Sequence, residues 1–111
     1  MKKNFPLSYI EISKNNLIKN LQLFKKIAKK GTKFSVVIKG NAYGHGQNEI
    51  VKILEPLVDY FQVDSIEELI LLRKNSKKKV FILGYVQKSD IEEAIKLGVF
   101  YPLFQLRNFL I

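Results

Sequence analysis

The feature that most constrains this chain is an alternation of short apolar segments with amphipathic ones. Apolar segments of strand length occur at 33–39, 60–64, 79–84 and 99–104, and residues at helical spacing separate them. Strands that alternate with helices form right-handed βαβ units around a parallel sheet. The sequence therefore predicts an α/β fold with four parallel strands and with the helices on one side of the sheet.

Start and stop signals support the first two helices. Ser13 is the expected N-cap of a helix that ends at Gly31. The apolar residues of this helix recur at helical spacing and predict its inward face: Leu17, Leu21, Phe24 and Ala28. A second helix is predicted from Gln47 to about Val58, and Pro56 should kink it or end its regular part.

Two capping boxes mark the remaining helices. Ser65 is followed three residues later by Glu68, and Ser89 stands in the same relation to Glu92. In a capping box the serine hydroxyl and the carboxylate satisfy N–H groups at the start of a helix. We therefore expect one helix to begin at Ser65 and another at Ser89.

Length limits how much of a closed fold is present. The chain has 111 residues, which is the size of one domain, whereas a complete (β/α)8 TIM barrel needs about 250 residues. The fourth strand also contains Pro102, which lacks the N–H that a central strand needs. We expect parallel βα units that form about half of a TIM barrel.

Composition excludes several classes of function. The chain has no cysteine, so disulfides and thiolate metal sites are excluded, and we expect no metal site. The net charge is +9, but only Arg73 and Arg107 among the 19 basic residues are arginine. Arginine makes the bidentate contacts of nucleic-acid recognition, so we expect a lysine-rich surface and no nucleic-acid partner. No apolar run approaches the ~18 residues of a membrane span, and we expect a cytoplasmic protein with no membrane partner.

Lys39 is the residue whose position most needs an explanation. Side chains alternate along a strand, so Lys39 shares a face with Val37 and Ser35, while Val36 and Ile38 point the other way. The apolar face suits packing against helices, and the face with Lys39 suits a barrel interior. Lys39 also ends its strand, and barrel enzymes place their chemistry at the carboxyl ends of the strands.

Two interpretations of Lys39 follow from these residues. A lysine at a strand end, before the glycine-rich loop of Gly40, Gly44 and Gly46, can be a solvated side chain. In an enclosed site, the same amine could form a Schiff base with a carbonyl group. Pyridoxal phosphate carries such a carbonyl and also needs a group that holds its phosphate. The residues alone leave both interpretations open.

The segment "VVIKGNAYGHG" resembles the signature of the alanine racemases, which are pyridoxal-phosphate enzymes of fold type III. The resemblance continues through "EIVKILEPLVDYFQVDSIEELILLR" and "VFILGYV" and covers essentially the whole chain. Only the amino-terminal part of the family is represented. The resemblance implies that residues 1–111 are the amino-terminal part of the cofactor-binding barrel domain, without the carboxyl-terminal β domain.

The resemblance also implies roles for individual residues. Lys39 matches the catalytic lysine that binds the cofactor and acts as acid or base on one face of the substrate. Tyr43 matches the cofactor-binding tyrosine that hydrogen-bonds the phosphate. His45 matches a motif histidine for which we expect a structural hydrogen bond within the loop, and Leu83 is a weaker candidate for lining the cofactor site. Gly40 stands where the family usually has alanine.

The activity implied is the interconversion of L- and D-alanine, which supplies D-alanine for peptidoglycan, by an enzyme that is a homodimer at full length. The family's second base is a tyrosine of the carboxyl-terminal domain, so we expect the isolated chain to be inactive. Two alternatives stay open: a non-catalytic remnant that binds the cofactor or a partner chain, and a racemase of another amino acid.

Overall fold

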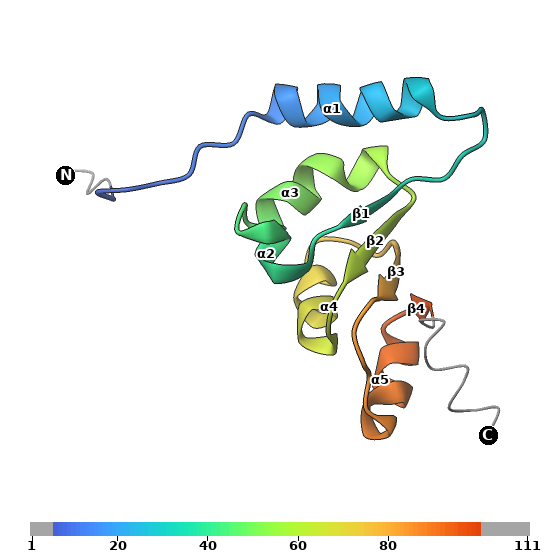
Figure 1. The fold of residues 1–111 in the computed structure, drawn as a ribbon. Helices are drawn as coiled ribbons and strands as arrows, with labels where there is room; N and C mark the ends of the chain where they lie inside the picture. Colours follow the sequence, from blue (N-terminus) through green and yellow to red (C-terminus); the bar gives the residue numbers. More distant parts are fainter. Residues whose placement is uncertain (1–5, 101–111) are drawn as a thin grey trace.

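The computed structural model describes residues 6–100, with the side chain of Phe100 left out of the description. Helices and strands alternate along the described chain, as predicted (Figure 1). In chain order, the elements are α1 (Lys14–Ile27), β1 (Ser35–Val37), α2 (Lys39–Tyr43), α3 (Gln47–Leu54), the 3-10 turn η1 (Glu55–Leu57), β2 (Tyr60–Val63), α4 (Ile66–Leu72), β3 (Lys79–Ile82), the 3-10 turn η2 (Lys88–Asp90), α5 (Ile91–Lys96) and β4 (Val99–Phe100).

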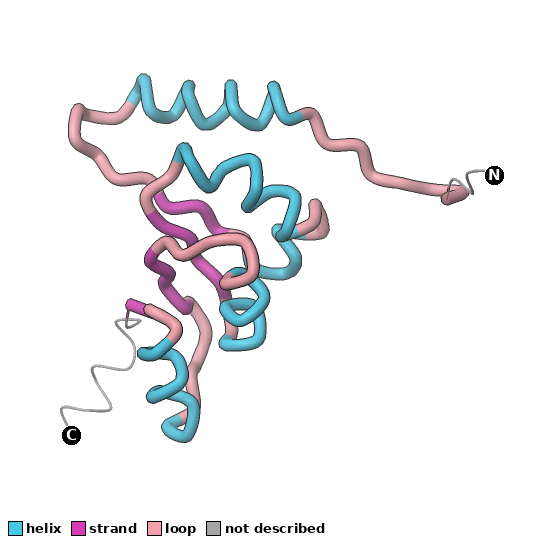
Figure 2. The backbone as a smooth tube through the Cα atoms, turned by 180° about the vertical axis from the view of Figure 1, so that it is seen from behind, coloured by secondary structure: helices cyan, strands magenta, loops and turns pink. Residues whose placement is uncertain are grey.

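The strands form one parallel sheet in the order β1-β2-β3-β4. The register aligns Val36 with Phe61 and Phe61 with Val80, and Val80 with Val99. Figure 2 shows the strands side by side, with α1 running along the outer side of α3. The prediction of four parallel strands is therefore confirmed.

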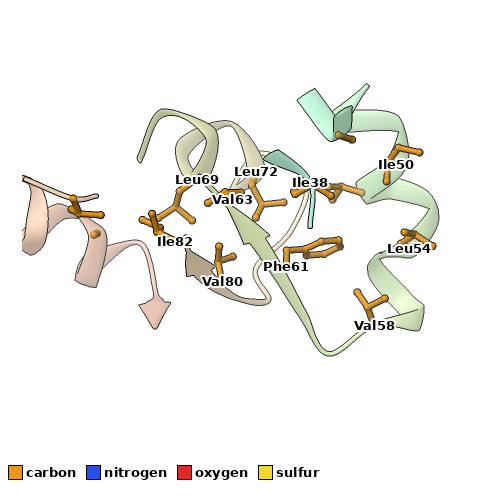
Figure 3. Close-up of a cluster of buried hydrophobic side chains, with 14 residues drawn as sticks. Ile38, Ile50, Leu54, Val58, Phe61, Val63, Leu69, Leu72, Val80 and Ile82 are labelled. Carbon is orange, nitrogen blue, oxygen red and sulfur yellow. The ribbon is translucent and has the colours of Figure 1, made fainter. Parts of the chain in front are cut away.

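One face of the sheet is buried beneath the helices. Phe61, Val63, Val80 and Ile82 have no exposed surface, because α3, α4 and α5 cover them (Figure 3). The helices contribute Ile50, Val51, Leu54, Leu69, Leu72 and Ala94 to the same core. Full burial of one such side chain stabilises the fold by about 1.5–3 kcal/mol. The helices cover one side, as the sequence predicts.

The opposite face of the sheet is only half-buried and has mixed chemistry. Val37, Gln62 and Phe81 align across three strands. The Gln62 amide donates a hydrogen bond to the Ser35 hydroxyl at 2.9 Å, and the rings of Tyr60 and Phe81 meet edge to face at 5.5 Å. This face corresponds to the barrel interior expected from the alternation along 33–39.

The first helix differs in part from its prediction. Ser13 is the N-cap, and its hydroxyl accepts a hydrogen bond from the N–H of Asn16 at 3.2 Å. The helix ends at Ile27, four residues before Gly31, and Phe24 is 65% exposed instead of facing inward. Leu17 and Leu21 alone touch the core from the predicted face, because α1 lies outside α3 and not directly on the sheet.

Other boundaries were predicted with mixed success. Pro56 lies in η1 directly after α3, so the regular helix ends where its proline predicts. The capping box at Ser89 is wrong, because Ser89 lies inside η2 and its hydroxyl donates to the Asp90 carboxylate at 3.1 Å. Of the predicted strand 99–104, only Val99–Phe100 is described, and Pro102 lies outside the described residues.

None of the helices within residues 6–100 has the length and apolar character of a membrane-spanning segment.

Arg73, at the end of α4, contacts the segments that lead into β3 and β4. Its guanidinium donates hydrogen bonds to four carbonyl oxygens, those of Leu97 at 2.6 Å, Lys78 at 2.8 Å, Ser76 at 3.2 Å and Gly98 at 3.5 Å. Burial lowers the pKa of Arg73, and the Glu55 carboxylate opposes that shift. An arginine used in this way holds the fold together and is not available to an external ligand.

Replacing Arg73 by lysine should lower the free energy of unfolding by about 1–3 kcal/mol, because an ammonium cannot reach all four carbonyls as the guanidinium fork does and leaves some of them unpaired. Urea denaturation followed by circular dichroism measures this change. The neighbouring Lys74→Ala substitution is the control, since Lys74 is exposed. Equal stability of Arg73→Lys and the parent chain would show that the fork contributes nothing.

Candidate functional site

Three side chains extend the half-buried face past the carboxyl ends of the strands. Lys39, Asp64 and Leu83 each lie two residues beyond the aligned row of Val37, Gln62 and Phe81. The Lys39 ammonium lies 3.9 Å from the Asp64 carboxylate, with 39% of the lysine side chain exposed. The strand predicted over 33–39 is shorter in the structure, where β1 ends at Val37 and Lys39 lies two residues beyond its carboxyl end. The structure also adds Asp64, which sequence reasoning missed.

The backbone after Lys39 forms a left-handed turn. Gly40, Asn41, Ala42 and Tyr43 have φ between 54° and 60°, which is the left-handed helical region. This conformation costs roughly 1–2 kcal/mol for an ordinary L-residue. The element labelled α2 is therefore a strained turn, and surrounding contacts must hold it.

Hydrogen bonds from within the loop supply part of that support. Ala42 N–H donates to the Ile38 carbonyl at 2.8 Å, and Gly46 N–H donates to the Asn41 carbonyl at 2.9 Å. The ring nitrogen Nδ1 of His45 lies 2.9 Å from the Ala42 carbonyl oxygen. Because a carbonyl only accepts, Nδ1 must carry the proton. The structural loop hydrogen bond expected of His45 is confirmed.

Glu68 and Gln47 connect the turn to the rest of the fold. The Glu68 carboxylate accepts hydrogen bonds from the N–H of Gly40 at 2.8 Å and from that of Asp64 at 2.7 Å. The side chain of Gln47 is buried, and its amide donates to the Glu68 carbonyl at 3.1 Å. Gln47 N–H donates to Asn41 Oδ1 at 2.8 Å, so Asn41 caps α3. The capping-box pattern was the one sequence signal that pointed to Glu68.

Tyr43 and Leu83 are both accessible. Tyr43 exposes 63% of its surface and Leu83 39%. A mainly apolar groove of about 230 Å³ borders Tyr43 and His45 between α1, β1 and α3, and Lys39 does not line it. Its other walls are Ile12, Leu17, Val36, Val37, Ala42, Ile50 and Leu54. The Lys39 amine is therefore not part of this groove, and it lies against Asp64 instead.

A metal centre finds no support in this part of the chain. Within residues 6–100, no three side chains of histidine, cysteine, aspartate or glutamate are grouped as metal ligands would be. The group that faces the Lys39 amine is the Asp64 carboxylate, and the Glu68 carboxylate lies on the backbone just after Lys39.

Parallel βα units with an amine at the carboxyl end of the first strand define a barrel-type α/β domain. The family model for the alanine racemase N-terminal domain matches residues 12–108. The chain belongs to the alanine racemase family.

Relatives by sequence are racemases. The chain is 43% identical over 94 residues to the alanine racemase of Fusobacterium nucleatum, and the matched region covers 83% of this chain and 26% of that protein. It is 41% identical over 85 residues to the serine/alanine racemase of Enterococcus gallinarum, covering 75% of this chain and 12% of that one. The chain thus spans about a quarter or less of the length of these relatives.

Solved structures agree on the fold. The alanine racemase of Clostridium difficile 630 superposes with a TM-score of 0.73 at 37% identity, covering 78% of this chain and 23% of that one. The Bacillus anthracis alanine racemase with bound L-Ala-P gives 0.72 at 27% identity, covering 81% and 24%. The four parallel units therefore form about half of a (β/α)8 barrel of the alanine racemase type, as the sequence predicts.

Replacing Gly40 by alanine should lower the free energy of unfolding by about 1 kcal/mol, since alanine resists the left-handed conformation. No atom lies within 4 Å of the position that the added Cβ would occupy, so the cost is purely conformational. Thermal unfolding measures it. Gly31→Ala is the matched reference, because Gly31 also has positive φ and open space but lies outside the site. It should lower the free energy of unfolding by a similar amount. A stabilising Gly40→Ala would contradict the left-handed turn.

Proposed function

We propose that this chain supplies the lysine-bearing part of a pyridoxal-phosphate-dependent alanine racemase. The observation that carries the proposal is the Lys39 amine at the carboxyl end of β1. Lys39 lies within residues 12–108, which the family model matches. Residues 1–111 would then be the amino-terminal part of the cofactor-binding barrel domain. The homodimer and the cytoplasmic location that the resemblance implies stay predictions.

The residues present fit one end of this cofactor. A primary amine that is partly exposed can reach a carbonyl, and the Lys39 side chain meets that condition. The Tyr43 hydroxyl, on the turn directly after Lys39, is a donor suited to the phosphate. When bound, pyridoxal phosphate supplies an electron sink that stabilises negative charge at the carbon that loses its proton.

The chain's own groups would act around that chemistry. Lys39 would hold the cofactor and, as a free amine after the substrate has displaced it, would take or return the α-proton on one face of the substrate. Tyr43 would anchor the phosphate, and it belongs to the same left-handed turn that begins at Lys39. Leu83 lies in the same row as Lys39, where it would line the cofactor site. The substrate proposed is alanine, and serine is the first alternative to test because one relative is a serine/alanine racemase.

Incubation with millimolar pyridoxal phosphate followed by borohydride should attach the cofactor covalently to Lys39, ahead of the other lysines. Peptide mapping by mass spectrometry measures the labelled fraction at each site. Lys33→Ala is the matched control, because Lys33 lies two residues before β1, as Lys39 lies two residues after it. In the parent chain, labelling spread evenly over the lysines, or labelling of other lysines with none at Lys39, would refute the assignment.

The isolated chain should not racemise alanine at an enzyme-like rate. Each positioned acid or base contributes about 10²–10⁴-fold, and the proposed function assigns this role to Lys39 alone among the described residues. The site is also open to water, which weakens its electrostatic interactions. Chiral analysis of L-alanine and L-serine after incubation with excess cofactor measures the rate, with Lys39→Ala and free cofactor as references. D-alanine formation far above both references would contradict this prediction.

A further inference from the structure

We propose that Glu68 is a positioning residue of the Lys39 site, a role that rests on the function proposed for Lys39. Its carboxylate bridges the carboxyl ends of two neighbouring strands. One oxygen accepts from Gly40 N–H at 2.8 Å after β1, and the other accepts from Asp64 N–H at 2.7 Å after β2. Hydrogen bonds from N–H groups to an ionised carboxylate are shorter and stronger than neutral ones.

The two amides that Glu68 holds belong to the site itself. Gly40 directly follows Lys39, and Asp64 is the residue whose carboxylate lies 3.9 Å from the Lys39 ammonium. Glu68 therefore fixes the two backbone points from which the Lys39 and Asp64 side chains depart. Because β1 and β2 are adjacent, a change in their separation at this end would change the distance between the two charged groups.

Helix capping alone does not explain this geometry. In a capping box, the carboxylate returns to the N–H of the N-cap residue itself. Here the N-cap is Ser65, whose hydroxyl accepts from Glu68 N–H at 3.3 Å, but the Glu68 carboxylate reaches beyond it to Asp64 and to Gly40, 28 residues away in the chain. The side chain thus connects two strands, a contact that capping of α4 does not require.

A second route of hydrogen bonds runs through the same residue. Gln47, 1% exposed, donates from its side chain to the Glu68 carbonyl at 3.1 Å and from its backbone to Asn41 Oδ1 at 2.8 Å. Asn41 lies inside the left-handed turn. The turn is therefore tied to the start of α4 at two points, Gly40 and Asn41. Without the Glu68 carboxylate, the turn keeps only the connection through Asn41 and Gln47, and fewer contacts hold its strained backbone in place.

The test compares Glu68→Gln with Glu67→Gln in the same chain. Both substitutions remove one carboxylate from the first turn of α4, so they change the helix charge equally, but only Glu68 touches Gly40 and Asp64. A glutamine presents one oxygen and one NH₂ group, and the NH₂ group cannot accept from the second backbone N–H. Glu68→Ala is a third variant that removes both acceptors.

Two readouts separate positioning from general stability. Amide hydrogen exchange at Gly40 and Asp64, followed by NMR, should become at least about tenfold faster in Glu68→Gln, while exchange at Phe61 and Val80 stays as in the parent. Both amide proton signals should also move upfield together. The fraction of Lys39 labelled by pyridoxal phosphate and borohydride should fall at least about fivefold, consistent with loss of orientation. Glu67→Gln should change neither readout.

The possible results distinguish a failure of the role proposed for Glu68 from a failure of the function proposed for Lys39. Unchanged exchange at Gly40 and Asp64 in Glu68→Gln would overturn the bridge. Faster exchange with Lys39 labelling equal to that of the parent would reduce Glu68 to a structural residue and overturn its positioning role. Absence of labelling at Lys39 in the parent chain would refute the proposed function, and the exchange comparison would then decide alone whether the bridge exists. Equal effects of Glu67→Gln and Glu68→Gln would also overturn the proposal.

Discussion

The parallel register between β1, β2 and β3 is the constraint on which the rest of this structure depends. It aligns Phe61 with Val80, so that α3 and α4 can cover one continuous apolar surface. The same register also brings Lys39, Asp64 and Leu83 into one row beyond the strand ends. A shift by one residue would turn every side chain to the opposite face. The core and the site are consequently set by one alignment.

The site combines a stable support with a strained connection. The strands end in a well-packed sheet, yet the chain leaves β1 through a left-handed turn that includes Ala42 and Tyr43. Such backbone persists only where the surroundings over-determine it, and here Glu68, Asn41 and Gln47 provide that support. The arrangement fixes the backbone at Lys39 while the lysine side chain stays partly exposed.

Much of the fold could be predicted because its signals are local. The order of elements, the covered face of the sheet and the N-caps at Ser13 and Ser65 follow from periodicity and capping. The errors also have physical causes. Phe24 keeps helical spacing but α1 does not lie on the sheet, and Ser89 has the sequence of an N-cap but lies within a 3-10 turn. The exposure of Phe24 depends on how α1 packs against distant elements, whereas at Ser89 the neighbouring Asp90 takes the N-cap position of α5.

The sequence by itself determined the α/β alternation, the two faces of β1 and the place of Lys39 at a strand end, since each depends on residues close together in the chain. Only the tertiary structure decided how that place is held. The hydrogen bond from Gly40 to Glu68 spans 28 residues, and the one from Gln47 to Glu68 spans 21. Contacts of this kind exist only once the strands have paired, because no local pattern specifies which distant carboxylate will meet a strand end.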